Sequence, residues 1–193
     1  YGEGPSGTSS WGKYLEIANF TGADVSLDGY LLAGITNGGD GYEKFVSFTA
    51  GTTLANGEVW VIGRAESGDG SPESLYGQID QVDSDISHNG DDAYKLFKKA
   101  SASDDPSQTT TVVDVFGDYQ GDPGSDWTAC GDTAASSESV MIKKATKAGT
   151  DSWATSAGTD ATDCWWEITK ISDQDAHDYA TVGSHTWTGE TNN

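Results

Sequence analysis

The chain has 193 residues, which suits one domain with a substantial core, and no change in composition marks a second domain. Its 31 acidic and 10 basic residues give a formal net charge of -21, so its field repels phosphate backbones and anionic lipid. Direct binding to nucleic acid or to a membrane surface is therefore disfavoured, and no apolar run approaches the ~20 residues that cross a bilayer. The seven Trp, eight Tyr and five Phe can build a core, while 25 Gly favour a β protein with many turns.

Short apolar or alternating runs, each bounded by turn residues, predict strands along the chain. These runs are 14–20, 25–27, 30–35, 45–48, 58–62, 93–97, 111–116, 139–143 and 165–168. Gly, Ser and Thr rich segments predict an N-terminal loop over 1–12 and a tail over 181–193, and 65–77, 98–111 and 117–126 predict long loops. The segment 78–86 fits a short helix or an extended connection. We expect one all-β domain over 1–193, a β-sandwich of about eight or nine strands.

Cys130 and Cys164 are the only two cysteines. Two thiols are too few for a zinc site, and no neighbouring His has the usual ligand spacing, so we expect a disulfide. The alternative is two separate buried thiols. A disulfide would close a loop of about 35 residues and contribute at most roughly 3.5 to 4 kcal/mol to stability. It would also place the protein in an oxidising compartment, which indicates an extracellular or cell-surface location.

The stretch Asn89-Gly90-Asp91-Asp92 predicts a turn that enters a central strand, because an Asn-Gly pair adopts positive φ at low cost. Its two carboxylates are either turn residues alone or oxygen ligands for a hard cation such as calcium. The candidate calcium ligands are Asp91, Asp92, Asp118, Asp122 and Asp126, with Asp173, Asp175 and Asp178 as further candidates near the C-terminus. No complete twelve-residue calcium loop occurs. The acidic excess is also explained by solubility in a saline or extracellular setting, so calcium stays open as a cofactor.

A series of short motifs occurs in order along nearly the whole chain. They are 14–19, the step 25–30, 51–62, Asn89-Gly90-Asp91-Asp92-Ala93, Asp114-Val115-Phe116-Gly117, 122–127, 139–144 and 182–186. Together they resemble the bacterial lamin tail domain family, of the kind attached to secreted nucleases and other extracellular hydrolases. The resemblance implies an immunoglobulin-like β-sandwich that serves as an accessory module. The chain departs from the family pattern before Glu3, where most of a strand is missing, and at 65–77 and 98–111, where the loops look longer.

Catalysis needs a nucleophile or a metal-bound water with a base beside it. The three imidazoles, His88, His177 and His185, lie in no recognised catalytic motif, and no glycine cluster has the form of a phosphate-binding loop. We therefore expect no catalytic residues and no enzymatic activity.

Trp11, Trp153 and Trp187 lie in polar, Gly-rich or Thr-rich surroundings, where they could stack on sugar rings or anchor loops. Trp60 is expected in the core because it lies in the most apolar run. These residues leave two functions open. The first is adhesion, targeting or assembly within a secreted bacterial protein, with a protein or polysaccharide at the cell surface or matrix as partner. The second is a calcium-dependent carbohydrate or polymer-binding module.

Overall fold

The computed structural model describes residues 1–4, 12–39, 41–65, 71–100, 111–172 and 177–189. The strands are β1 (Gly2–Glu3), β2 (Tyr14–Ala18), β3 (Val25–Ser26), β4 (Tyr30–Ile35), β5 (Lys44–Val46), β6 (Thr53–Leu54), β7 (Val59–Gly63), β8 (Gln81–Val82), β9 (Ala93–Lys98), β10 (Thr111–Phe116), β11 (Ser139–Lys143) and β12 (Trp166–Lys170). The helices are the short 3-10 helix η1 (Leu27–Gly29), α1 (Glu73–Tyr76) and α2 (Trp153–Ala157). Within these ranges, no helix is long and apolar enough to cross a membrane.

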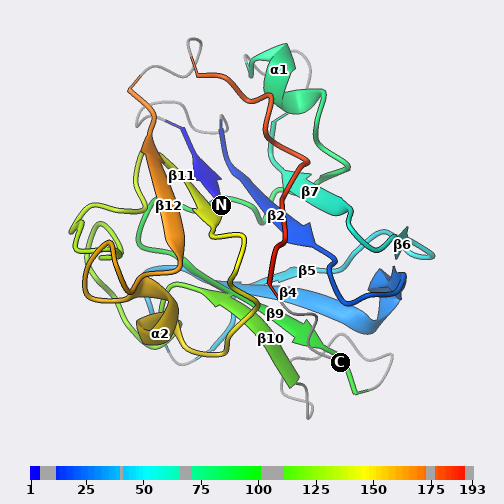
Figure 1. Ribbon diagram of the computed structural model, residues 1–193, viewed down its shortest axis with the longest axis horizontal. Helices are drawn as coiled ribbons and strands as arrows, with labels where there is room; N and C mark the ends of the chain where they lie inside the picture. Colours follow the sequence, from blue (N-terminus) through cyan, green and yellow to red (C-terminus); the bar gives the residue numbers. More distant parts are fainter. Residues whose placement is uncertain (5–11, 40, 66–70, 101–110, 173–176, 190–193) are drawn as a thin grey trace.

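Six strands form one sheet in the order β12-β11-β1-β2-β7-β8. Neighbouring strands are antiparallel except β7 and β8, which are parallel. The two-residue strand β1 lies between β11 and β2, where Gly2 pairs with Val140 on one side and Tyr14 on the other (Figure 1). Because β2 pairs with β7 over its full length, its opposite edge continues beyond the end of β1.

Four strands form the second sheet in the order β10-β9-β4-β5, with every neighbouring pair antiparallel. The register between β10 and β9 shifts between Val112 and Asp114. A small separate sheet joins β3 and β6. All three sheets consist of strands that the turn-rich sequence keeps short.

The main core fills the space between the two larger sheets, because alternate strand residues on their facing sides are apolar. In β2, Leu15 and Ile17 contribute to this core, whereas Tyr14 faces the other side of the sheet. Other members come from both sheets and the loops between them, among them Leu32, Ile35, Tyr94, Leu96, Phe116, Trp127, Met141 and Trp166. The chain is therefore an all-β sandwich.

A second apolar cluster covers the outer face of the six-stranded sheet. Its sheet residues include Tyr14 and Val61, and they are covered by Leu75 of α1 and by Tyr179 and Val182 of the C-terminal segment. This segment, residues 177–189, runs across the sheet close to β2 and β7 (Figure 1). The six-stranded sheet is thus covered on both faces.

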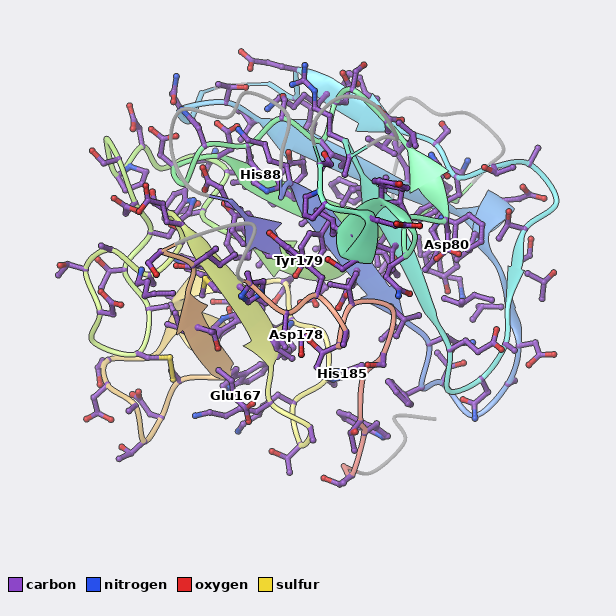
Figure 2. All side chains as sticks on the ribbon, turned by 90° about the horizontal axis from the view of Figure 1, so that it is seen from above. Asp80, His88, Glu167, Asp178, Tyr179 and His185 are labelled. Atoms are coloured by element: carbon purple, nitrogen blue, oxygen red, sulfur yellow. A yellow bond between two sulfur atoms is a disulfide. The ribbon has the colours of Figure 1, made fainter. Side chains whose placement is uncertain are left out.

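Cys130 and Cys164 form the predicted disulfide (Figure 2). It lies next to α2, whose Ala157 carbonyl accepts a hydrogen bond from the Cys130 N–H at 2.8 Å. Ser152 caps α2 by accepting from the Thr155 N–H at 3.2 Å. The disulfide therefore ties two connections and a short helix to the edge of the sandwich.

The all-β prediction is confirmed, and each of the nine predicted runs overlaps a strand. Eight of the twelve strands in the described ranges have three or more residues, while β1, β3, β6 and β8 have two. The predicted loop over 1–12 is wrong at Gly2 and Glu3, because both residues pair inside the six-stranded sheet. The loop predicted over 65–77 contains α1, and the ambiguous segment after it contributes β8 as an extended strand.

Candidate functional site

Asp91 and Asp92 are buried at the turn that enters β9. Lys44 Nζ lies 3.0 Å from Asp92 Oδ2, and the Asn37 N–H donates to Asp92 Oδ1 at 3.3 Å. With its nitrogen turned toward Asp91, the Asn37 side chain donates to both oxygens of that carboxylate at 3.1 and 3.2 Å. Burial raises the pKa of Asp91, and the neighbouring charge of Asp92 adds to the rise. The turn therefore uses both carboxylates to hold nearby segments together.

The backbone of this turn is also held from a second loop. Trp127 Nε1–H donates to the Asp92 carbonyl at 2.9 Å, and the Trp127 N–H donates to Ser136 Oγ at 2.7 Å. The Ser136 hydroxyl in turn donates to the Gly90 carbonyl at 2.6 Å. We refer to Asp92, Lys44, Asn37, Trp127 and Ser136 as the Asp92 cluster. In this cluster each buried polar group that we name has a protein partner.

The other predicted calcium ligands accept hydrogen bonds from backbone N–H groups. The pairs are Asp118 with Gln120 at 3.2 Å, Asp122 with Gly124 at 2.7 Å, Asp126 with Ser137 at 2.9 Å and Asp178 with Ala180 at 2.9 Å. Three of these four bonds span two residues, which is the usual role of Asp in a turn. Asp173 and Asp175 lie outside the described residues. Across the part of the chain that the structure describes, no three His, Cys, Asp or Glu form a group that could hold a metal ion, so calcium stays a prediction.

The tryptophans that we predicted as sugar-stacking candidates lie in different surroundings. Trp153, on α2, packs into the main core, with its ring centroid 5.3 Å from that of Phe116, 5.9 Å from Trp127 and 6.0 Å from Trp166. Trp187 stacks on Phe20, with centroids 6.2 Å apart and ring planes at 24°. Trp11 lies outside the described residues. Trp153 thus anchors a helix, because aromatic neighbours surround its ring.

His88 is fully buried in the core. Its Nε2 lies 2.7 Å from the Gly2 carbonyl oxygen, and its Nδ1 lies 3.3 Å from the Tyr94 hydroxyl. Burial lowers the pKa of His88 well below its usual value, so we assign a neutral ring whose Nε2–H donates to the Gly2 carbonyl. His185 lies well away from His88, on the C-terminal segment (Figure 2). His88 therefore acts as a structural bridge between β1 and β9.

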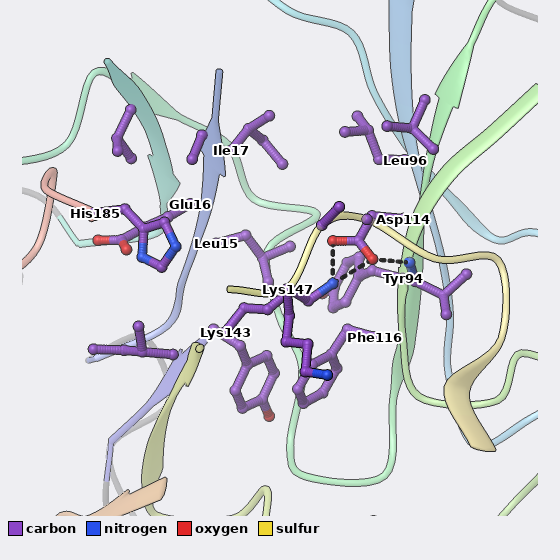
Figure 3. Close-up of a pocket in the computed structure, with 18 of the residues that line it drawn as sticks. Leu15, Glu16, Ile17, Tyr94, Leu96, Asp114, Phe116, Lys143, Lys147 and His185 are labelled. Carbon is purple, nitrogen blue, oxygen red and sulfur yellow. Dashed lines mark hydrogen bonds and ion pairs between the residues drawn. The ribbon is translucent and has the colours of Figure 1, made fainter. Parts of the chain in front are cut away.

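A cleft of about 400 Å³ lies between the two larger sheets (Figure 3). We call it the interior cleft. Its walls are mainly apolar and include Leu15 and Ile17 of β2, Leu96 of β9, Val113 and Phe116 of β10, and Met141 of β11. His185 and Trp187 of the C-terminal segment also line it. Because this hollow is concave and mainly apolar, with a few polar groups at its wall, it is the candidate functional site.

Three charged side chains that line the interior cleft, those of Lys143, Asp114 and Glu16, have hydrogen-bond partners. Lys143 Nζ of β11 donates to both carboxylate oxygens of Asp114 on β10, at 2.5 and 2.6 Å, and so links the two sheets (Figure 3). Asp114 also accepts from the Thr150 N–H at 3.0 Å. Glu16 accepts from the Gly183 N–H at 2.8 Å, and burial raises its pKa. Lys147 also lines the cleft, with its Nζ 5.1 Å from the centroid of the Trp165 ring, and most of the remaining wall is apolar.

The interior cleft opens where the six-stranded sheet lacks a strand. Tyr1 still pairs with Met141, because the Met141 N–H donates to the Tyr1 carbonyl at 2.9 Å and the Tyr1 nitrogen donates to the Met141 carbonyl at 3.2 Å. Beyond Tyr1, β2 continues through 16–18 and β11 through 142–143, and the described chain places no strand between them. We call this space the strand gap.

No local pattern predicted the interior cleft, although the run 14–20 predicted the strand that forms one of its walls. The available signal was the expected departure from the lamin tail pattern before Glu3. It did not indicate that the gap would reach the core.

No protein-family model matches this sequence, and no curated protein or solved structure is significantly similar to it. The lamin tail resemblance therefore stays a prediction. The fold and the candidate site rest on the residues and contacts described above.

Proposed function

We propose that this chain is a non-catalytic accessory module of a secreted or surface bacterial protein, which acts in adhesion, targeting or assembly beside an extracellular nuclease or other hydrolase. Its interior cleft takes up a polypeptide segment. The observation that carries this proposal is the continuity of the apolar cleft with the strand gap. An extended polypeptide supplies both backbone groups for the free strand edges and apolar side chains for the cleft.

The chemistry of the cleft favours a polypeptide over a phosphorylated or anionic ligand. Lys143 is neutralised by Asp114, and the chain carries a net charge of -21 that repels anions. Apolar walls instead reward the burial of aliphatic side chains, at about 25 cal/mol per Å². A protein partner therefore fits the cleft better than nucleic acid does.

The disulfide supports a location outside the cell, because such bonds persist in oxidising compartments. The alternative function, calcium-dependent binding of a carbohydrate or polymer, loses one of its stacking candidates, since the ring of Trp153 packs against Phe116 and Trp166. Trp187 lines the interior cleft, so its contacts are part of the polypeptide proposal.

Peptide binding tests the proposal directly. A fluorescein-labelled peptide of alternating Thr and Val should bind the chain saturably by fluorescence anisotropy, and a Gly-Ser peptide of equal length should bind much more weakly. Ala148→Trp places a large ring at the cleft wall and should abolish binding. The control is Ala180→Trp, an exposed position outside the cleft lining, which should bind as the parent chain does.

Two results would contradict the proposed function. Equal binding of both peptides, or of the two tryptophan variants, would remove the interior cleft as the docking site. Turnover of double-stranded DNA or of p-nitrophenyl phosphate by the purified chain, above that of an Ala148→Trp and a heat-denatured control, would show a catalytic role.

A further inference from the structure

The pairing around β1 fixes the register of any strand that enters the strand gap. Gly2 lies opposite Tyr14 on β2 and opposite Val140 on β11, and both pairings are antiparallel. For each residue added on the N-terminal side of Gly2, the residue opposite it is therefore one position later in the sequence on both β2 and β11. A residue attached to the Tyr1 nitrogen would lie between Glu16 and Ile142, and the next residue would lie between Ile17 and Lys143.

The free backbone groups of the two edges follow from the alternation of an antiparallel ladder. On β11 the Met141 N–H points to Tyr1, and the Lys144 N–H points away, to Trp165. By this period of two, Lys143 presents its N–H and C=O to the strand gap. On β2 the Asn19 N–H points away from the gap, to Glu58, so Glu16 and Ala18 present theirs to it.

The same alternation assigns the side chains of an incoming strand. The Tyr1 side chain points into the core, where its ring stacks on Phe116 with centroids 3.9 Å apart. The residue that would directly precede Tyr1 therefore faces outward, beside Glu16. On that face the Glu16 carboxylate accepts a hydrogen bond from the Gly183 N–H. The second residue before Tyr1 would face the interior cleft, beside Ile17. An apolar side chain fits that second position, and a polar one fits the first.

Two observations decide where the strand comes from. The strand gap is collinear with β1, and Tyr1, which directly precedes β1, already pairs with Met141, so a strand joined to Tyr1 extends an existing ladder. The Tyr1 nitrogen is buried, which lowers the pKa of a free amino group there, whereas a peptide bond keeps the contact to Met141 without a buried charge. A second copy is disfavoured, because two chains of net charge -21 repel each other.

We infer that the interior cleft is the slot of a β-strand that continues β1, and that polypeptide attached to the Tyr1 nitrogen fills it. This inference rests on the proposed function and names the polypeptide that the cleft receives. Such a segment enters the middle of the six-stranded sheet and does not leave as a flexible linker. A carrier attached at Tyr1 is therefore held in a fixed orientation relative to the module.

Extensions attached to Tyr1 test this inference. The first extension, Thr-Val-Thr-Val-Thr, places Val at the second and fourth positions before Tyr1, facing the cleft. The second, Thr-Pro-Thr-Pro-Thr, has the same length but lacks two strand donors. The third, Val-Thr-Val-Thr-Val, shifts the apolar residues to the outer face. Each chain is compared with the parent by thermal unfolding and by amide hydrogen exchange, and the free first peptide is added to the parent chain as a separate sample.

We expect the first extension to raise the Tm by about 5 °C or more, the third to raise it less, and the second to leave it near that of the parent chain. Amide exchange at Glu16, Ala18 and Lys143 should slow at least about tenfold with the first extension only. The Leu15 and Ile17 amides, which face β7, should change little. If the first extension behaves as the proline control while the free peptide binds, the inference is overturned and the proposed function stands. If neither protects these amides, both are overturned.

Discussion

The Asp92 cluster and the interior cleft border the same core but differ in how completely the fold closes it. In the cluster, Asp92 is 1% exposed, and its side chain and backbone accept hydrogen bonds from three other segments. At the cleft, β2 and β11 continue past the end of β1 with no strand of the described residues between them, and a hollow of about 400 Å³ lies there. Both regions join segments that are distant in sequence, but among the described residues only the Asp92 cluster is closed.

The difference shows what a strand contributes to a sandwich. A buried carboxylate can be satisfied by a few donors, as Lys44 and Asn37 do for Asp92. A strand gap leaves a row of backbone groups and a matching volume of core, which only another extended polypeptide replaces. We therefore expect the Asp92 cluster to determine stability and the interior cleft to determine what the module binds.

The largest effect is expected inside the Asp92 cluster. Asp92→Ala leaves the Lys44 ammonium in a mostly buried position without its carboxylate, and removing one member of a buried pair costs about 3–5 kcal/mol. Urea unfolding should show this loss in the free energy of unfolding with little change in its denaturant dependence. The matched control, Asp122→Ala, removes an exposed turn carboxylate and should cost less than about 1 kcal/mol. Equal losses in the two variants would mean that the buried Asp92 carboxylate contributes no more to stability than an exposed turn carboxylate does.

Removal of the disulfide should have the next largest effect. The double change Cys130→Ala and Cys164→Ala frees a connection of 34 residues in sequence separation and should cost about 2–4 kcal/mol. Trp127 of the Asp92 cluster lies three residues before Cys130 in the sequence. Removal of the disulfide should therefore also weaken the Asp92 cluster. Unfolding of the parent chain in the presence of dithiothreitol should match that of the variant. A parent chain whose stability is unchanged by the reductant would contradict this account.

A third effect concerns Glu3, which pairs with Ser139 at the end of β1 away from the strand gap. Burial raises its pKa from the usual 4.5 to about 7, although the Tyr1 hydroxyl donates to it at 2.9 Å and opposes this rise. The folded chain thus holds the proton more tightly than the unfolded chain does. Glu3 therefore contributes stability that is fully present below about pH 4.5 and is lost as the pH rises through 7.

The substitution Glu3→Gln should remove this pH dependence. Between pH 4.5 and 7, the parent chain should lose at most about 3 kcal/mol relative to the variant in urea unfolding. His88 acts in the opposite direction, because its lowered pKa makes the fold less stable as the pH falls below about 6.5, so only the difference between the two chains isolates Glu3. Glu58→Gln, at an exposed position, is the control. A pH-independent difference would contradict a buried, protonated Glu3.

The sequence predicted the framework better than the site, and the reason is physical. Alternation in runs such as 14–18 and 139–143 depends on neighbours two residues apart, so it reveals strands directly. The partners of Asp92 are distant in sequence, 48 residues away for Lys44 and 35 for Trp127, and no local pattern encodes them. The loop predicted at Gly2 and Glu3 was wrong for the same reason, since their pairing depends on β2 and β11.

The smallest effect separates Trp187 from Trp153, two residues of similar predicted role. Trp187→Ala removes a stacked pair with Phe20 at the wall of the interior cleft and should cost about 1 kcal/mol. Trp153→Ala removes a ring packed among Phe116, Trp127 and Trp166 and should cost about 2–4 kcal/mol. Because Trp187 lines the cleft, its loss should also weaken binding of the alternating Thr-Val peptide, while Trp153→Ala should leave the peptide affinity of the folded chain near that of the parent. Urea unfolding and anisotropy titration measure the two quantities separately. A Trp187 variant with unchanged peptide affinity would mean that the C-terminal segment covers the outer face of the sheet without shaping the cleft.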